Sequence, residues 1–380
     1  MSLNVVFVAS NEQLINLSRQ WKGQRWLCVD TEFVRVNTFY PELGLLQIAD
    51  EYGVYLVDPL ACADLQVIAD VLQDPQILKI MHSISEDIEV FSHALRCAPQ
   101  NIFDTQIGAA LAGKGGSIGY GALVEDYLSI GLPKSETRSD WLRRPLSSKQ
   151  LDYSADDVRY LYPVYQKLFE ELQHLGFYEA AVEESDRALN SALSNDPDDH
   201  YYLKLRGAWK LPTKKQQLLR SLCSWREQQA KSCNVPRQHV ISDNALIEIA
   251  QRRPSSIQKL SRIPKLRPSV IKTHSDTLLK LIRESEFDSG EFAGRIPPPL
   301  RLVEQKLYKR LKAIVLQFSE QTGIAPEVVG RRKVLEKAVR ETLDTGEVSL
   351  PDDFNGWRAQ NLRPMFEREM QLFLASVTVE

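Results

Sequence analysis

The stretch WLCVDTEF, residues 26–33, places two carboxylates at the end of an apolar run. The apolar part is typical of a buried strand, and Asp30 and Glu32 follow with one residue between them. Side chains two apart on a strand point to the same face, so the two carboxylates converge. Burying such charges is costly unless something compensates them, although a D-x-E alone is weak evidence of function.

The first half of the chain alternates strand-like and helix-like segments around this stretch. Apolar and β-branched runs predict strands at residues 5–9, 26–33, 43–49, 54–58 and 77–82. Helical spacing is found at residues 85–95, 104–112 and 122–128 and from Ser147 to about Leu175, and Ser10 with Gln13 forms a helix-start signature. These patterns predict an α/β domain with a hairpin-rich start over residues 1–193.

The second half is helical in period and contains two related segments. The stretch SNDPDD (194–199) predicts a loop, and the Gly- and Pro-rich residues 288–299 predict a linker. With an offset of 89 residues, Leu222 falls on Leu311, Val235 on Ile324, Val240 on Val329 and Leu246 on Leu335. Two copies of one small helical module, at residues 203–288 and 297–380, explain this pattern, with chance matching of leucines as the alternative.

Acidic and basic residues are divided unevenly between the halves. Residues 1–190 carry 27 acidic and 15 basic side chains, a net charge of −12, whereas residues 191–380 carry 23 and 32, a net charge of +9. This asymmetry indicates that one half of the chain holds a polyanion and the other half acts on it. The alternative is that the charges only form a solvated surface. Basic runs that could contact phosphates occur at residues 214–215, 252–253, 259–267 and 331–333.

Other features exclude several classes of protein. The five cysteines form no CxxC pair and the six histidines lack metal-ligand spacing, which argues against a disulfide framework and a zinc site. No apolar run is long enough to span a bilayer, and the N-terminal MSLNVVFVASNEQ lacks the features of a signal peptide. We therefore expect a cytoplasmic protein without a membrane partner, and oxygen ligands for any metal, which suit Mg²⁺ or Mn²⁺.

Two further acidic positions lie in settings comparable to that of the D-x-E pair. Asp87 falls in the first turn of a predicted helix that directly follows a strand, where capping of the helix is the simpler role. Asp157 follows Tyr153 by four residues, so both side chains project from the same face of a helix. Each position alone means little, but together with the strand pair they form a constellation.

This constellation resembles the DEDD superfamily of 3′-to-5′ exonucleases, in the subclass whose last motif contains a tyrosine. The segments VDTEF, HSISEDIEVF and LDYSADDVRYL, with others along almost the whole chain, are similar to the bacterial ribonuclease D family. The resemblance implies a ribonuclease H-like α/β exonuclease domain, with a mixed sheet and flanking helices, and then two all-α HRDC-like domains, the second more divergent. It assigns Asp30 and Glu32 to the first exonuclease motif, Asp87 to the second, and Tyr153 and Asp157 to the third.

Four carboxylates around a phosphodiester would repel it unless divalent cations lie between them. We therefore expect a two-metal site, with the ions about 4 Å apart. In this interpretation Asp30 bridges the ions, Glu32 and Asp157 bind the ion on the side of the nucleophile, and Asp87 binds the second ion. Tyr153, with an ordinary pKa of about 10, is expected to orient the attacking water by hydrogen bonding.

The resemblance implies a 3′-to-5′ exoribonuclease that releases 5′-mononucleotides from RNA with a free 3′ end, above all precursor tRNA and other small structured RNAs. A DNA-directed 3′-to-5′ exonuclease and a non-catalytic nucleic-acid-binding scaffold are the alternatives. We expect the protein to be a monomer. Phe33, Gln47 and His82 flank the motifs and could contact the terminal nucleotide, with a role in the core as the competing interpretation.

Overall fold

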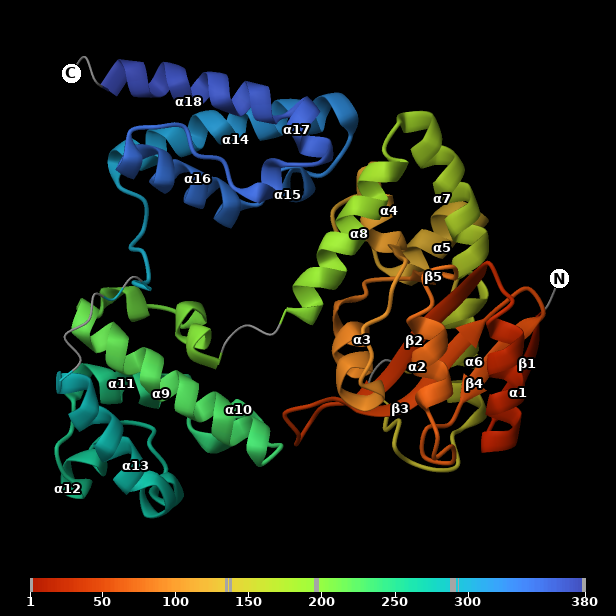
Figure 1. The fold of residues 1–380 in the computed structure, drawn as a ribbon, viewed down its shortest axis with the longest axis horizontal. Helices are drawn as coiled ribbons and strands as arrows, with labels where there is room; N and C mark the ends of the chain where they lie inside the picture. The colour runs from red at the N-terminus through yellow and green to blue at the C-terminus, as the bar shows by residue number, and fades with distance from the viewer. Residues whose placement is uncertain are drawn as a thin grey trace. The chain divides into compact units, whose positions relative to one another are not determined.

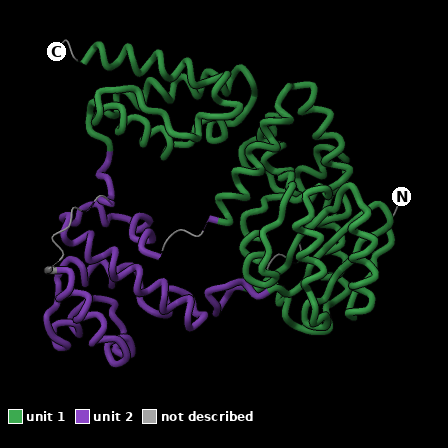
Figure 2. The backbone as a smooth tube through the Cα atoms, viewed as in Figure 1, with its two compact units in different colours: residues 1–34, 43–193, 300–380 green, residues 35–42, 194–299 purple. Residues whose placement is uncertain are grey.

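The computed structural model describes residues 3–133, 136, 139–194, 198–287, 292 and 294–377 (Figure 1). The chain divides into two compact units (Figure 2). Unit 1 comprises residues 1–34, 43–193 and 300–380, and unit 2 comprises residues 35–42 and 194–299. The predicted loop at 194–199 and the predicted linker at 288–299 lie partly outside the described residues. None of the described helices is long and apolar enough to cross a membrane.

The described part of unit 1 contains a mixed sheet with the strand order β1-β4-β3-β2-β5-β6. The strands are β1 (Asn4–Val8), β2 (Trp26–Val34), β3 (Glu42–Ala49), β4 (Gly53–Val57), β5 (Leu78–Met81) and β6 (Ile102–Asp104). β3 runs antiparallel to β4, whereas the pairs β1–β4, β2–β5 and β5–β6 are parallel. The five predicted strands are confirmed, with ends within one residue of those predicted, whereas the short β6 was not predicted.

Helices connect these strands. In chain order they are α1 (Asn11–Trp21), α2 (Gln66–Leu72), α3 (Ser85–Val90), the π-helical η1 (Phe91–Leu95), α4 (Thr105–Leu111), α5 (Tyr120–Leu128), α6 (Ser148–Arg159), α7 (Leu161–Leu175) and α8 (Tyr178–Leu193). The helical run predicted from Ser147 is divided between α6 and α7. Pro163 lies in the first turn of α7, where the missing N–H of a proline is tolerated.

Alternate residues of the strands contribute to two different cores, one on each face of the sheet. On one face, residues such as Val29 and Val57 pack with α1, α2 and α3. On the other face, Cys28 and Leu45 pack with Ala155 of α6. Because side chains alternate along a strand, Asp30 and Glu32 lie on the same face as Cys28, toward α6.

Unit 2 is a helical module that also contains the connection between β2 and β3. Its elements are the 3₁₀ segments η2 (Asp198–Lys204) and η3 (Ala208–Lys210) and the helices α9 (Thr213–Ser232), α10 (Arg237–Val240), α11 (Asp243–Arg252), α12 (Ile257–Leu260) and α13 (Pro268–Phe287). Phe39, in the β2–β3 connection, is buried in the core of this module. Asn234 Oδ1 accepts hydrogen bonds from the backbone N–H groups of Phe39 and Tyr40, each at 3.1 Å.

The C-terminal module, residues 300–377, repeats the arrangement of unit 2. Its elements are α14 (Leu302–Thr322), α15 (Pro326–Val329), α16 (Arg332–Thr345), η4 (Asp352–Phe354), α17 (Trp357–Asn361) and α18 (Arg363–Val377). Pro326 and Arg332, which begin α15 and α16, lie 89 residues after Arg237 and Asp243, which begin α10 and α11. The offset of 89 residues found in the sequence is therefore present in the starts of these helices.

The C-terminal module packs on the α/β part of unit 1. Leu307 and Phe366 share a hydrophobic core with Leu168 of α7. Arg358 forms an ion pair with Glu184 of α8, and these side chains are only 7% and 8% exposed. A buried pair of this kind tolerates the loss of one partner poorly, so it fixes the position of the module within unit 1.

Candidate active site

Three carboxylates from two elements converge on the α6 face of the sheet. Asp30 and Glu32 lie on β2, and Asp157 lies on α6. One carboxylate oxygen from each residue lies within 4.8 Å of those of the other two. The three side chains are half-buried, so they remain open to a solvent ion.

Helix α6 presents Tyr153 and Asp157 one turn apart. Ser147 and Gln150 form a capping box, in which each side chain bonds the backbone N–H of the other residue, and this fixes the start of the helix. The Tyr153 hydroxyl donates a hydrogen bond to the Asp157 carboxylate. The indole ring of Trp141 packs 6.2 Å from the Tyr153 ring. The tyrosine is thus held beside the carboxylates.

Asp87 is placed by interactions that sequence reasoning missed. The Thr31 hydroxyl, from β2, donates a hydrogen bond to Asp87 Oδ1. Asp104, at the end of β6, accepts hydrogen bonds from the N–H groups of Ser83 (3.0 Å) and Ile84 (3.1 Å), just before α3 begins. These bonds hold Ser83 in a left-handed conformation with φ of 61°. Asp87 lies outside the trio of converging oxygens, but its charge acts on Asp30.

Burial raises the pKa values of all four carboxyl groups, and nearby acidic groups add to the effect. The pKa of Asp30 is raised well above its ordinary value by burial and then by its acidic neighbours. Burial, with Asp157 and Asp87, raises the pKa of Glu32 to about 9. Burial raises the pKa of Asp87 and that of Asp157 to about 7 each. Burial and the charge of Asp157 also raise the pKa of Tyr153, so its hydroxyl stays protonated at neutral pH.

The residues present fit divalent cations. All four groups are hard oxygen donors, the ligands that Mg²⁺ and Mn²⁺ prefer. No lysine or arginine among the described residues forms an ion pair with any of the four carboxylates. Concentrated negative charge without a cationic side chain requires either protons, as the raised pKa values indicate, or bound cations.

The other three candidates from the sequence lie in different surroundings. Phe33 packs in the core of the opposite sheet face. His82 Nε2 donates to the Ile118 carbonyl (3.1 Å), and its Nδ1 lies 2.9 Å from the Thr105 hydroxyl, so both ring nitrogens are engaged within the domain. Gln47 is fully buried on β3, and neither atom of its amide has a hydrogen-bond partner among the described residues.

Comparison with known proteins places this site in a family. A 3′-5′ exonuclease family model matches residues 5–173, and the HRDC domain model matches residues 215–282. Ribonuclease D of Pseudomonas paraeruginosa is 36% identical to the chain over 94% of this chain and 95% of its own length. The chain belongs to the ribonuclease D family. Its exonuclease domain is of the DEDD type, a class that uses divalent metal ions.

Other members of the ribonuclease D family are similar along their whole length. Ribonuclease D of Escherichia coli is 31% identical over 94% of this chain and 96% of its own. The crystal structure of Escherichia coli RNase D, described as an exoribonuclease involved in structured RNA processing, superimposes with a TM-score of 0.87 at 30% identity. That match covers 97% of this chain and 99% of the Escherichia coli chain. The predicted fold class and family are therefore confirmed.

Proposed function

We propose that this ribonuclease D family member is a 3′-to-5′ exoribonuclease whose Asp30, Glu32, Asp87 and Asp157 bind two divalent cations, Mg²⁺ or Mn²⁺. The observation that carries the proposal is the convergence of three carboxylate oxygens within 4.8 Å, with no cationic side chain of the described residues paired to them. Bound cations would supply a water of lowered pKa and neutralise the charge of the phosphate.

We assign roles to the individual side chains from their positions. Asp30, whose pKa responds to all three other carboxylates, is assigned as the ligand that both cations share. Glu32 and Asp157 belong to the same trio and are assigned to the cation on the side of the nucleophile. Asp87, outside the trio, is assigned to the other cation. The protonated Tyr153 hydroxyl can orient the water but not remove its proton.

The reaction and the substrate rest on the family. Water adds to the phosphorus of the last phosphodiester and the bond to the 3′ oxygen breaks, so a 5′-mononucleotide leaves and the shortened RNA keeps a 3′ hydroxyl. The relative from Escherichia coli is described as acting in structured RNA processing. We assign the chain to the same kind of substrate, RNA with a free 3′ end, with precursor tRNA and other small structured RNAs foremost. We further propose a monomer that works in the cytoplasm, where such RNAs are processed.

A metal-dependent digestion tests the proposal. An RNA oligonucleotide labelled at its 5′ end, mixed with the protein and Mg²⁺ or Mn²⁺, should shorten from the 3′ end one nucleotide at a time and stay intact with a chelator. Asp30→Asn should abolish shortening and keep RNA binding. Asp152→Asn is the matched control, because Asp152 is an exposed acid of α6, the helix that carries Asp157. Full activity in Asp30→Asn would contradict the ligand assignment.

The choice between polymers needs a second experiment. Equal amounts of a ribo- and a deoxyribo-oligonucleotide of one sequence, carrying different labels, are digested in one tube. An exoribonuclease shortens the RNA first. Preferential loss of the DNA would favour a DNA-directed exonuclease, and persistence of both polymers with chelator-insensitive binding would favour a non-catalytic scaffold.

A further inference from the structure

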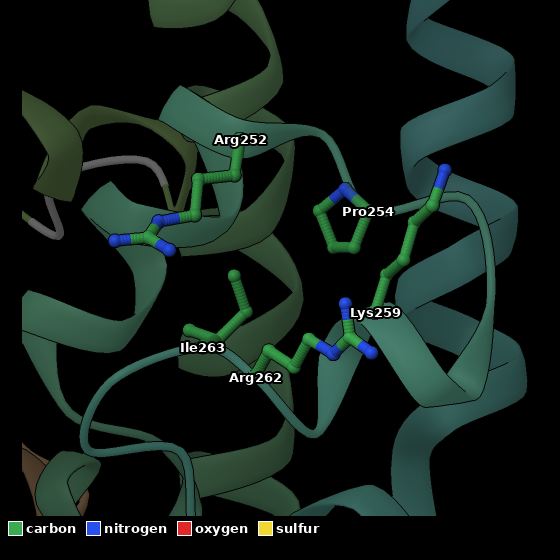
Figure 3. Close-up of a pocket in the computed structure, with 5 residues that line it drawn as sticks. All are labelled: Arg252, Pro254, Lys259, Arg262 and Ile263. Atoms are coloured by element: carbon green, nitrogen blue, oxygen red, sulfur yellow. The ribbon is translucent and has the colours of Figure 1, made fainter.

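A pocket in unit 2 is lined by three cationic side chains and two apolar ones. Arg252 comes from the end of α11, Lys259 from α12, and Arg262 from the segment that follows (Figure 3). The buried Pro254 and Ile263 complete the lining, and the pocket has a volume of about 180 Å³. At about 30 Å³ per water molecule, this is room for several waters or for one phosphate group with part of its sugar.

The backbone around the pocket is held in place from two sides. Arg253, between two of the lining residues, adopts the left-handed conformation with φ of 46°. Its guanidinium donates hydrogen bonds to the Ile282 carbonyl (3.3 Å) and the Ser285 hydroxyl (3.2 Å) of α13. Lys215 Nζ donates to the Gln251 carbonyl at 2.6 Å. A non-glycine residue persists in this conformation only where its surroundings hold it, so the turn is fixed.

The positive charge of the pocket is only partly compensated. Arg252 Nε pairs with Glu248 at 2.6 Å. Lys259 Nζ donates to the Ser255 hydroxyl at 3.0 Å, a neutral partner. No acidic side chain among the described residues forms an ion pair with Lys259 or Arg262. In Figure 3 the hydrocarbon part of Lys259 passes near the Arg262 guanidinium, and its ammonium end points away from that group.

We propose that this pocket binds one phosphate group of the RNA substrate. Arg262 offers the planar fork that matches phosphate oxygens, and Lys259 adds a point charge. Pro254 and Ile263 offer an apolar surface for the attached ribose or base. The phosphate has two possible sources, an internal phosphodiester or a phosphate at the 5′ end. The assignment rests on the proposed function for the identity of the ligand as RNA.

Binding measurements on the full-length chain test this pocket without hydrolysis. The probe is an RNA hairpin with a single-stranded 3′ tail, made with either a 5′ hydroxyl or a 5′ phosphate, and binding is titrated in a chelator at several salt concentrations. The variant is Lys259→Gln/Arg262→Gln. The control is Lys272→Gln, an exposed lysine of unit 2 that does not line the pocket.

The double variant should bind at least about tenfold more weakly, and the slope of log affinity against log salt should fall by about one, for the one phosphate contact that is lost. Its melting temperature should stay unchanged. A preference for the 5′-phosphorylated hairpin that the variant loses identifies the end as the ligand, and equal weakening of both hairpins identifies the backbone.

Affinity and slope equal to those of the control would overturn the pocket assignment. A second result would also overturn it. In that case the double variant loses both affinity and melting temperature, and Lys259→Arg/Arg262→Lys, which keeps both charges, fails to restore RNA binding. Failure of the proposed function would look different, because the unmodified protein would then leave RNA intact with Mg²⁺ whatever its affinity in a chelator.

Discussion

Adding Mg²⁺ or Mn²⁺ to the metal-free protein at pH 7 should release protons from the carboxyl cluster. With a pKa of about 9, Glu32 is protonated at pH 7, and Asp87 and Asp157, with pKa values of about 7, are each about half protonated. The pKa of Asp30 is raised as well. Since a carboxyl group must lose its proton to bind a cation, we expect about two protons or more released per molecule, one from Glu32 and about half from each of Asp87 and Asp157.

Titration calorimetry in two buffers of different ionisation enthalpy, at equal pH and salt, counts these protons. The difference in apparent binding enthalpy divided by the difference in buffer enthalpy gives the number released. Glu32→Gln should reduce that number by about one, because one titrating group is gone. Asp152→Asn should leave it unchanged. At pH 10 the unmodified protein should release fewer than about one proton.

Release near zero at pH 7 would refute this reasoning, because it would mean that the carboxylates are ionised without a cation. The same linkage predicts the stability of the metal-free protein. Folded Glu32 keeps a proton that the unfolded chain loses above its ordinary pKa of 4.5. The unfolded state then binds fewer protons, so the free energy of unfolding should fall as pH rises from 4.5 to about 9. Saturating Mg²⁺ should raise the melting temperature more at pH 9 than at pH 6.

Three substitutions test the surroundings of the site and the packing of the C-terminal module. Thr31→Val removes the hydrogen bond that lowers the pKa of Asp87, so the acid limb of the pH–rate profile should move to higher pH. An unchanged acid limb would show that this hydrogen bond does not affect the reaction. Tyr153→Phe should reduce kcat about 10- to 100-fold with KM and melting temperature nearly unchanged, and an equal rise in KM would indicate a role in binding instead. Arg358→Met should lower the free energy of unfolding, measured by urea denaturation, by about 3–5 kcal/mol, because it leaves Glu184 buried without this partner. The double variant Glu184→Gln/Arg358→Met should recover part of that loss.

Local periodicity was enough to predict which site residues share a face. The two-residue spacing of Asp30 and Glu32 and the four-residue spacing of Tyr153 and Asp157 each define one face of a regular element, and the structure brings these faces together. The mixed sheet and the 89-residue repeat were also predictable, because apolar residues recur with the period of a strand or a helix.

Interactions between distant segments could not be predicted in this way. Asp104 fixes the turn before α3 across about 20 residues of sequence, through bonds to Ser83 and Ile84 that no spacing rule anticipates. The burial of Gln47 depends on which segments pack over β3, and the sequence around a polar strand residue does not show whether other segments bury it. β6, three residues long, is too short for a periodicity to be visible.

The membership of residues 35–42 in unit 2 has a consequence for the synthesis of this protein on the ribosome. Phe39 is translated 195 residues before Asn234, whose side chain accepts its N–H, and before every helix of unit 2 that buries its ring. During that interval the aromatic tip of the β2–β3 connection has no cover, and such exposed apolar groups promote association of nascent chains. A fragment that ends at residue 193 would keep that exposure permanently, so a soluble catalytic fragment would need polar replacements at Phe39 and Tyr40.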